Sequence, residues 1–210
     1  NPSFLPDDMP YSSDLIYDVS TVGRCDNEKA PFLIHQKLRN SSDLNSLVMT
    51  NDGVYKSSTV NDYVQDNQHW TEPRHTMRGL PHSEVIEHIS RSKVFCSTWP
   101  KESWGITAME ALGCGVPTIL MTGDNDIHAS EIVAASRSHY FKINRKCSSD
   151  EFETTVREFA ITMKNRRDEI AEMTREKHSL SKWKSCIDKV IDMRYSDKNK
   201  SRSDLTEFFT

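Results

Sequence analysis

The hydrophobic positions of the chain form two kinds of pattern that alternate along it. Short runs rich in β-branched and aromatic residues predict strands, and stretches whose apolar residues recur every three or four positions predict helices. The predicted strands cover residues 14–23, 46–50, 74–79, 93–97, 116–121 and 140–143. The predicted helices cover about 29–40, 84–92, 105–112 and 131–135. Strands separated by helices need crossover connections, so we expect a three-layer α/β fold with a mostly parallel sheet covered on both faces.

The region after Ser149 has a helical pattern that is rich in charge. Its apolar residues fall on one stripe: Phe152, Val156, Phe159, Ala160 and Met163. A second C-terminal helix is predicted at about 180–193, and its Trp183 is interpreted as a packing residue. Residues 195–210 are dominated by Ser, Asp, Lys and Arg, and we expect them to form a polar, mobile tail.

Length, charge and cysteine usage narrow the class of protein. The 210 residues suit one well-buried domain, and a net charge of -4 gives no sign of nucleic-acid or membrane binding. There is neither an apolar run long enough to span a membrane nor a signal-peptide pattern, so we expect a cytoplasmic protein. The scattered cysteines argue against a disulfide framework or structural zinc.

The beginning of the chain has the composition of a linker. It starts at Asn1 rather than Met and continues through a short acidic lead that contains Pro2 and Pro6. We therefore expect residues 1–13 to lead from a missing N-terminal domain, and residues 14–194 to form the domain with its C-terminal helices.

Two predicted loops carry chemistry suited to a nucleotide. In a parallel sheet, ligands bind at the carboxyl ends of the strands, where loops lead into helices. Arg24 and Lys29 follow the first predicted strand, and Glu102, Gly105 and Glu110 follow the strand at 93–97. The spacing predicts two cations, two carboxylates and a helix start at one edge of the sheet.

Each of these groups matches a part of a nucleotide diphosphate-sugar. The helix beginning near Gly105 offers backbone N–H groups to a phosphate, and glycine allows a close approach. Glu110, one turn into that helix, can accept hydrogen bonds from a ribose diol, and Glu102 can address the sugar hydroxyls. Arg24 and Lys29 can stabilise the diphosphate leaving group without a metal. The Asp-Asn-Asp run at 124–126 is interpreted as a turn and not as a metal motif.

The same loops resemble family 4 (group 1) retaining glycosyltransferases. Residues 22–29 (VGRCDNEK) resemble the family's GR....K segment, and residues 102–119 (ESWGITAMEALGCGVPTI) resemble its E.FG....EA.A.G.PVI segment. Residues 78–80 (RGL) and 129–133 (ASEIV) look like two further segments of the family. The resemblance implies the C-terminal, Rossmann-like half of a GT-B fold. Trp104 replaces the usual Phe, and residues 122–126 (TGDND) replace a paired-glycine turn.

The resemblance also assigns roles to individual residues. Arg24, Lys29 and Glu102 would be catalytic, with the two cations on the diphosphate and Glu102 on the donor sugar. The other donor-binding residues would be Gly23, Leu80, Trp104, Gly105, Ile106 and Glu110, with Glu110 on the ribose. The family needs no metal or other cofactor, and its substrate is a UDP-, GDP- or ADP-linked sugar. The acceptor, of unknown class, would be bound mainly by the absent N-terminal domain, so we expect this chain alone to bind nucleotide without transferring sugar.

Several alternatives stay open at this stage. Glutamates eight residues apart are common by chance, so the weight lies in the flanking residues. Residues 113–115 (GCG) precede a strand and are interpreted as a helix stop. His82 either approaches the nucleotide base or belongs to an ordinary helix start with Ser83 near the cap. A nucleotide-sugar epimerase of the same architecture and a non-catalytic nucleotide- or carbohydrate-binding module are the competing functions.

Overall fold

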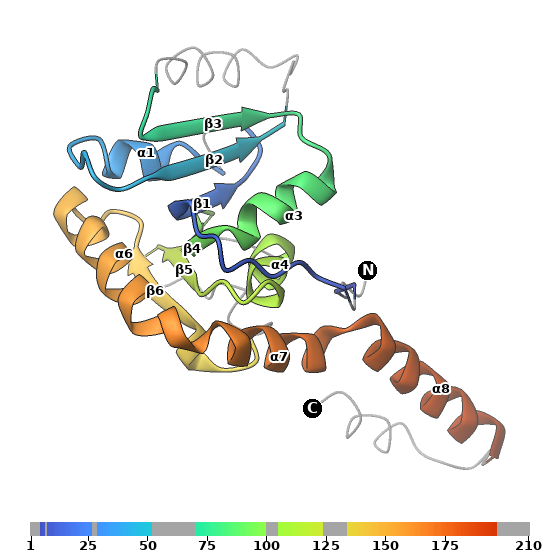
Figure 1. Cartoon of the computed structure of the whole chain (residues 1–210). Helices are drawn as coiled ribbons and strands as arrows, with labels where there is room; N and C mark the ends of the chain where they lie inside the picture. Colours follow the sequence, from blue (N-terminus) through green and yellow to red (C-terminus); the bar gives the residue numbers. More distant parts are fainter. Residues whose placement is uncertain are drawn as a thin grey trace.

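The computed structural model confirms the α/β, Rossmann-like architecture. It describes residues 5–6, 8–26, 29–51, 70–99, 105–123 and 134–196, with the backbone alone for 192–196. Within these ranges a six-stranded sheet lies between helices on both of its faces (Figure 1). The predicted helix at 131–135 and the loops that hold Glu102, Trp104 and residues 124–126 fall largely or wholly outside the described residues.

The strands of the sheet are close to their predicted positions. They are β1 (Tyr17–Val22), β2 (Ser46–Thr50), β3 (Arg74–Arg78), β4 (Ser92–Ser97), β5 (Thr118–Thr122) and β6 (Tyr140–Asn144). Every pairing is parallel, and the strand order is β3-β2-β1-β4-β5-β6. The chain therefore moves outward from β1 in one direction and then in the other. The crevice between the carboxyl ends of β1 and β4 lies at this reversal, where such sheets bind ligands.

Most helices differ from the sequence patterns by a few residues at their ends. They are α1 (Leu33–Lys37), α3 (His82–Ser90), α4 (Ile106–Gly113), α6 (Ser149–Met163), α7 (Arg167–His178) and α8 (Leu180–Ser196). The stripe predicted after Ser149 corresponds to α6, whereas α7 was not predicted as a helix of its own. A short 3-10 turn, Lys164–Arg166, separates α6 from α7.

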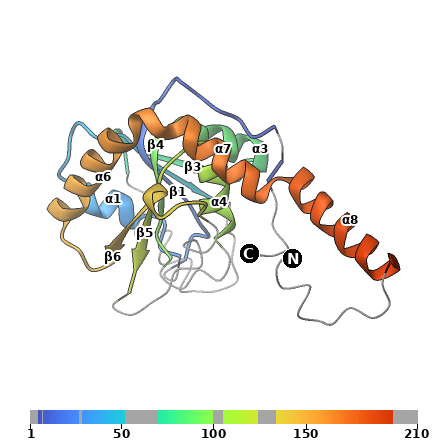
Figure 2. The same cartoon turned by 90° about the horizontal axis from the view of Figure 1, so that it is seen from below.

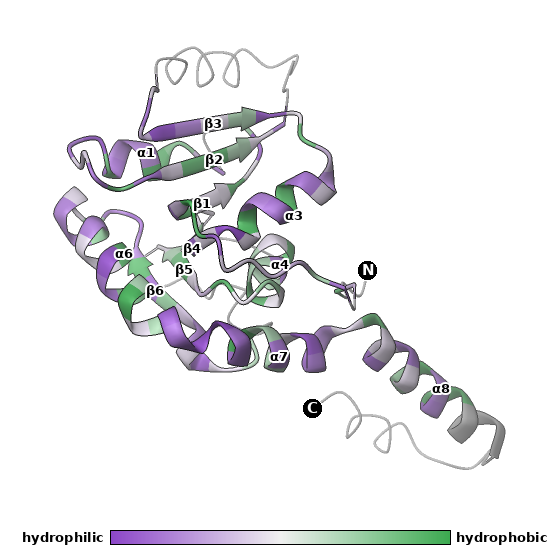
Figure 3. Ribbon diagram, viewed as in Figure 1, coloured by the Kyte–Doolittle hydropathy of each residue, from purple (hydrophilic) through white to green (hydrophobic). Residues whose placement is uncertain are grey.

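The alternation of side chains along each strand divides the core into two layers. On one face Val48, Val94 and Ile119 pack with Phe32, the N-cap of α1, and with Phe152 of α6. On the other face, strand residues that include Leu47 and Phe95 pack with α3 and α4. Figure 3 shows why α7 was hard to predict, because its ribbon is largely hydrophilic. Its buried side chains, including Ile170 and Ala171, occupy only a narrow stripe.

The segment predicted as a linker packs against the domain in its described part. Leu5 and Met9 are buried in the core, and Leu5 forms a parallel bridge with Ser179 at the junction of α7 and α8. Arg175 donates to the carbonyl of Met9 at 2.8 Å. The segment thus runs to the start of α8, which extends away from the body of the domain (Figures 1 and 2). Whether residues 1–13 lead from another domain stays a prediction.

A buried arginine, Arg167, connects three separate segments of the chain through their backbone carbonyls. The guanidinium of Arg167 donates to the carbonyls of Ser12 (2.8 Å), Ser90 (2.8 Å) and Gly115 (3.1 Å), and it lies 5.2 Å from the Tyr11 ring centre. Gly115 has a φ of +73°, and a Cβ there would lie 2.5 Å from the carbonyl oxygen of Arg167. This confirms residues 113–115 as a helix stop that only glycine fits at its last position.

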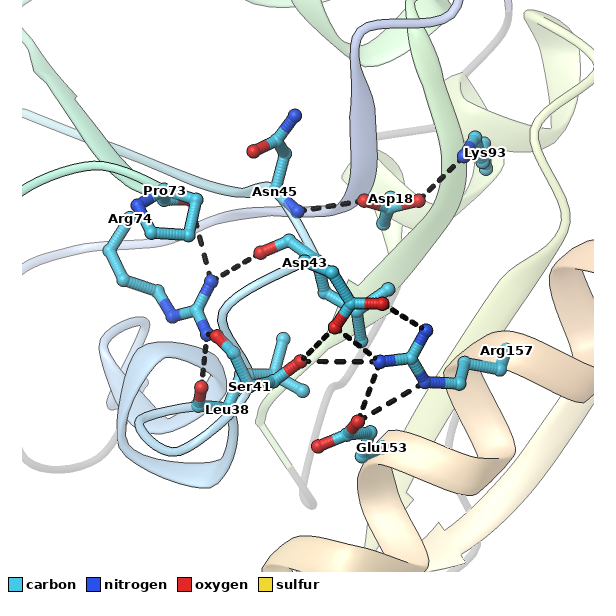
Figure 4. A network of polar contacts seen from close by, with 11 residues as sticks. Asp18, Leu38, Ser41, Asp43, Asn45, Pro73, Arg74, Lys93, Glu153 and Arg157 are labelled. Atoms are coloured by element: carbon cyan, nitrogen blue, oxygen red, sulfur yellow. Dashed lines mark hydrogen bonds and ion pairs between the residues drawn. The ribbon is translucent and has the colours of Figure 1, made fainter.

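The amino edge of the sheet is held by a network of charged side chains (Figure 4). The buried guanidinium of Arg74 donates to the carbonyls of Leu38, Ser41 and Leu44. Arg157 on α6 pairs with Asp43 in the loop before β2, and its Nη2 lies 2.7 Å from Asp43 Oδ1. At the same edge Lys93 Nζ lies 2.6 Å from Asp18 Oδ1, which joins β4 to β1. These contacts connect segments that are far apart in the sequence.

Candidate functional site

A cavity of about 630 Å³ opens at the carboxyl edge of the sheet. It is lined by residues that directly follow β1, β2, β3 and β4 and by the first turns of α3 and α4. Predicted site residues in its lining are Gly23, Arg24, Lys29, Leu80, Ile106 and Glu110. The structure therefore brings the loop after β1 together with the first turns of α4, as the sequence predicted.

The loop after β1 presents two cations from a short and well-connected turn. Gly23 continues the pairing of β1, because its N–H donates to the carbonyl of Met49 at 3.1 Å. Asp26 accepts the backbone N–H of Lys29 at 2.7 Å and lies 3.2 Å from Nε of Arg24. The Arg24 side chain is 53% exposed and lines the cavity, and Asp26 in its own loop holds it.

Lys29 is positioned by the loop after β4. The hydroxyl of Thr98 donates to the carbonyl of Lys29 at 2.6 Å, and Lys29 Nζ lies 5.1 Å from the centre of the Trp99 ring. An ammonium group over an aromatic face is stabilised by the ring quadrupole. Thr98 and Trp99 line the cavity and were missed from the sequence. Their position directly after a predicted strand was the signal that could have found them.

The start of α4 supplies unpaired backbone donors next to these cations. Gly105 is the N-cap with φ +65°, a left-handed conformation that favours glycine, and no side chain caps the helix. The carbonyl of Gly105 accepts the N–H of Met109 at 2.9 Å, which begins the helical pattern. Ile106 and Thr107 line the cavity, so the positive end of this helix is directed at it.

Glu110 lies one turn further along α4 and is only 8% exposed. Its Oε1 lies 2.8 Å from Nε2 of His82, the first residue of α3. Burial raises the pKa of the Glu110 carboxyl, and the hydrogen bond from His82 acts in the opposite direction. An ionised carboxylate accepts only, so the imidazole donates from Nε2. His82 therefore contacts Glu110 at the start of α3, where Pro81 and not Ser83 is the N-cap.

The other residues weighed in the sequence lie away from this cavity or outside the description. Trp183 lies on α8, is 36% exposed and does not line the cavity. Glu102 and Trp104 precede Gly105 in a stretch that lies outside the described residues, so their positions stay predictions. In the described part of the chain, no cluster of three His, Cys, Asp or Glu side chains could hold a metal ion. None of the described helices is long and apolar enough to cross a membrane, and a cytoplasmic location stays a prediction.

Comparison with known proteins identifies one family. The family model for glycosyl transferases group 1 matches residues 19–177, well over half of the chain. The matched region begins within β1 and contains β2 to β6 and the described residues that line the cavity. A search of curated protein sequences gives no match.

Solved structures with the same fold are glycosyltransferases of low sequence identity. The C-terminal domain of a group 1 glycosyltransferase (LpcC) from Francisella tularensis has a TM-score of 0.62 and 12% identity, over 84% of this chain and 99% of that domain. Sucrose-phosphate synthase from Thermosynechococcus elongatus has a TM-score of 0.62 and 14% identity, over 91% of this chain and 47% of the synthase. HepE of Anabaena, solved with UDP and glucose, has a TM-score of 0.63 and 11% identity, over 84% of this chain and 51% of that protein.

The share of each solved structure that the chain covers differs between them. The chain spans about half the length of the synthase and of HepE, but nearly all of the LpcC C-terminal domain. The described fold therefore corresponds to the C-terminal half of a GT-B glycosyltransferase.

Proposed function

The chain belongs to the group 1 glycosyltransferases, and on this premise we propose that its cavity binds the nucleotide diphosphate-sugar donor of a glycosyl transfer. The observation that carries the proposal is the meeting of two cations, an open helix N-terminus and a buried carboxylate around one cavity of about 630 Å³ at the reversal point of the sheet. A volume of this size suits a nucleotide-sized ligand.

Arg24 and Lys29 bind the diphosphate in this proposal. Breaking the glycosidic bond leaves a nucleoside diphosphate whose negative charge grows in the transition state. The two side chains and the N–H groups at the start of α4 are fixed in place before the ligand arrives, by Asp26, Thr98 and Trp99 on one side and by the helix on the other. Preorganised donors of this kind lower the barrier without a metal, and we propose metal-independent transfer.

The ribose and the sugar lie on opposite sides of the diphosphate, near the start of α4. Glu110 accepts hydrogen bonds from the ribose hydroxyls, and the backbone at Leu80 and the end of β2 face the base. Glu102, with the backbone at Trp104 to Ile106, binds the sugar on the other side of the diphosphate. The resemblance to retaining enzymes supports retention of the anomeric configuration.

The acceptor site belongs mainly to a second domain in this proposal. HepE, which has the same fold over about half of its length, was solved with UDP and glucose. Its likeness supports binding of a nucleoside diphosphate and a sugar by this cavity. We propose that the reaction takes place in the cleft between this domain and the second one. We therefore expect the 210-residue chain to bind the nucleotide and to transfer no sugar by itself.

Isothermal titration calorimetry of the chain with UDP, GDP and ADP tests donor binding. At least one of the three should bind, and replacing Arg24 and Lys29 together by Ala should weaken it at least about 100-fold, since each charge-assisted contact contributes about 1.5–3 kcal/mol. The matched control is Arg39→Ala, which removes an exposed cation just beyond α1 and should change nothing. Binding of none of the three diphosphates contradicts the proposal.

The full-length protein is needed to test the transfer itself. NMR of the product should show the anomeric configuration of the donor, and activity should persist in EDTA. Inversion of the anomeric centre, or loss of activity that added divalent metal restores, would contradict these parts of the proposal. Release of an epimerised nucleotide-sugar would identify the competing epimerase activity.

A further inference from the structure

The contact between His82 and Glu110 joins two helices at the wall of the cavity. Nε2 of His82 at the start of α3 lies 2.8 Å from Oε1 of Glu110 on α4, and both residues line the cavity. Among the described residues His82 is the only polar partner of the Glu110 side chain. The pairing spans 28 positions of sequence, so it depends on how the two helices pack.

A buried carboxyl group needs such a partner in order to act as an acceptor. Burial favours its neutral form, and a protonated carboxyl accepts hydrogen bonds less strongly than a carboxylate. The N–H of His82 stabilises the ionised form and occupies Oε1. Because a carboxylate has about four acceptor positions on its two oxygens, Oε2 and the remaining lone pairs are left for a ligand.

We propose that His82 is a positioning residue, which holds the Glu110 carboxylate so that it recognises a vicinal diol and selects ribonucleotides over nucleotides that lack the ribose hydroxyls. This inference rests on the proposed function of the cavity. The His82 side chain is 71% exposed and contributes little to the core, so its presence at this contact is better explained by the site than by packing. Its role is exerted through Glu110 and not through contact with the base.

The test compares UDP, GDP and ADP, each with its 2′,3′-dideoxy analogue, by calorimetry on wild-type chain and variants. Wild-type chain should favour the ribose form about 10- to 100-fold, as expected for hydrogen bonds to a charged acceptor. In His82→Ala the ribose form should bind about 10-fold more weakly, while the dideoxy form changes less than about 2-fold. His82→Gln, whose amide N–H can also donate, should recover most of the preference.

Two further variants separate positioning from structural damage. Ser83→Ala alters the next exposed residue at the same helix start and should leave the preference unchanged. Glu110→Gln should abolish the preference, and adding His82→Ala to it should then have no further effect. Circular dichroism melting should show all variants folded.

The outcomes distinguish this inference from the function on which it rests. If wild-type chain binds none of the diphosphates, the proposed function is overturned and the inference with it. If wild-type chain binds with a ribose preference that His82→Ala preserves, only the inference is overturned. Equal weakening of the ribose and dideoxy forms would show that His82 contacts the base or phosphate directly, which also overturns it.

Discussion

The two edges of the sheet use their charged residues in different ways. At the amino edge, Arg157 with Asp43 and Lys93 with Asp18 join elements distant in the sequence. At the carboxyl edge, the ion pair of Arg24 lies within its own loop, with Asp26. The hydrogen bond between His82 and Glu110 connects two separate helices at this edge.

This difference shows how one sheet can separate stability from binding. The amino-edge charges are engaged with one another across distant segments, which stabilises the fold and leaves them little capacity for a ligand. The carboxyl-edge charges are held in a fixed direction by their partners and still line the cavity, so they can contact a ligand. Substitutions at the amino edge should therefore lower stability and spare nucleotide affinity, and substitutions at the carboxyl edge should do the reverse.

The largest effect is expected from Arg74→Met at the amino edge. The substitution removes the donors that satisfy the carbonyls of Leu38, Ser41 and Leu44. Because buried carbonyls without donors are costly, urea unfolding should show a loss of about 3 kcal/mol. Nucleoside diphosphate affinity should stay within about 2-fold of wild type under conditions where the variant is folded. Unchanged stability would contradict the structural role of Arg74.

The next largest effect is a pH dependence that arises from His35 on α1. This residue is fully buried between the rings of Phe32 and Trp70, and burial lowers its pKa to about 3. The unfolded chain binds a proton near the ordinary value of 6.5 and the folded chain does not, so stability falls as the pH decreases below 6.5.

The contribution of His35 to the slope should rise from about 0.7 kcal/mol per pH unit at pH 6.5 towards about 1.4 near pH 5, and His35→Phe should remove this contribution. Urea midpoints measured at several pH values provide the data. His178→Gln, at a partly exposed histidine, is the control and should keep the wild-type slope. The same slope in His35→Phe as in wild type would show that other groups cause it.

A smaller effect is expected at the carboxyl edge from Thr98→Val. The hydroxyl that donates to the carbonyl of Lys29 is lost, while the shape of the side chain is kept. The loop that carries Lys29 should become less ordered, and nucleoside diphosphate affinity should fall about 3- to 10-fold, as for the loss of one neutral hydrogen bond. Thr155→Val, which removes a hydroxyl bonded within α6, should leave the affinity unchanged. A Thr98 variant with wild-type affinity would contradict this account.

The smallest effect is expected from Arg157→Ala. Its ion pairs with Asp43 and Glu153 lie at the surface, where solvent and salt screen them. The melting temperature should fall by no more than about 3 °C in low salt and by less in 1 M NaCl. A large decrease that is insensitive to salt would mean that the amino edge depends on this pair more than its exposure suggests.

Much of the fold and part of the site could be predicted from the sequence. The strands were found because their runs are short, apolar and bounded by turn residues, and the loops after β1 and β4 followed from them. α7 was not separated from α6 because only a narrow stripe of it is buried. Arg74 and Arg167 were missed because their partners are backbone carbonyls, which leave no signal in the residue pattern.

The sequence by itself determined the alternation of strands and helices, the parallel sheet, the loop that carries Arg24 and Lys29 and the helix that carries Glu110, because these depend on local periodicity and on the general geometry of crossovers. Only the tertiary structure decided that Thr98 and Trp99 support Lys29, that His82 reaches Glu110, and that the amino-edge charges bridge distant segments. Those contacts join residues separated by up to 114 positions, and the packing angles that bring them within hydrogen-bond distance are set by the whole core and not by any local run of sequence.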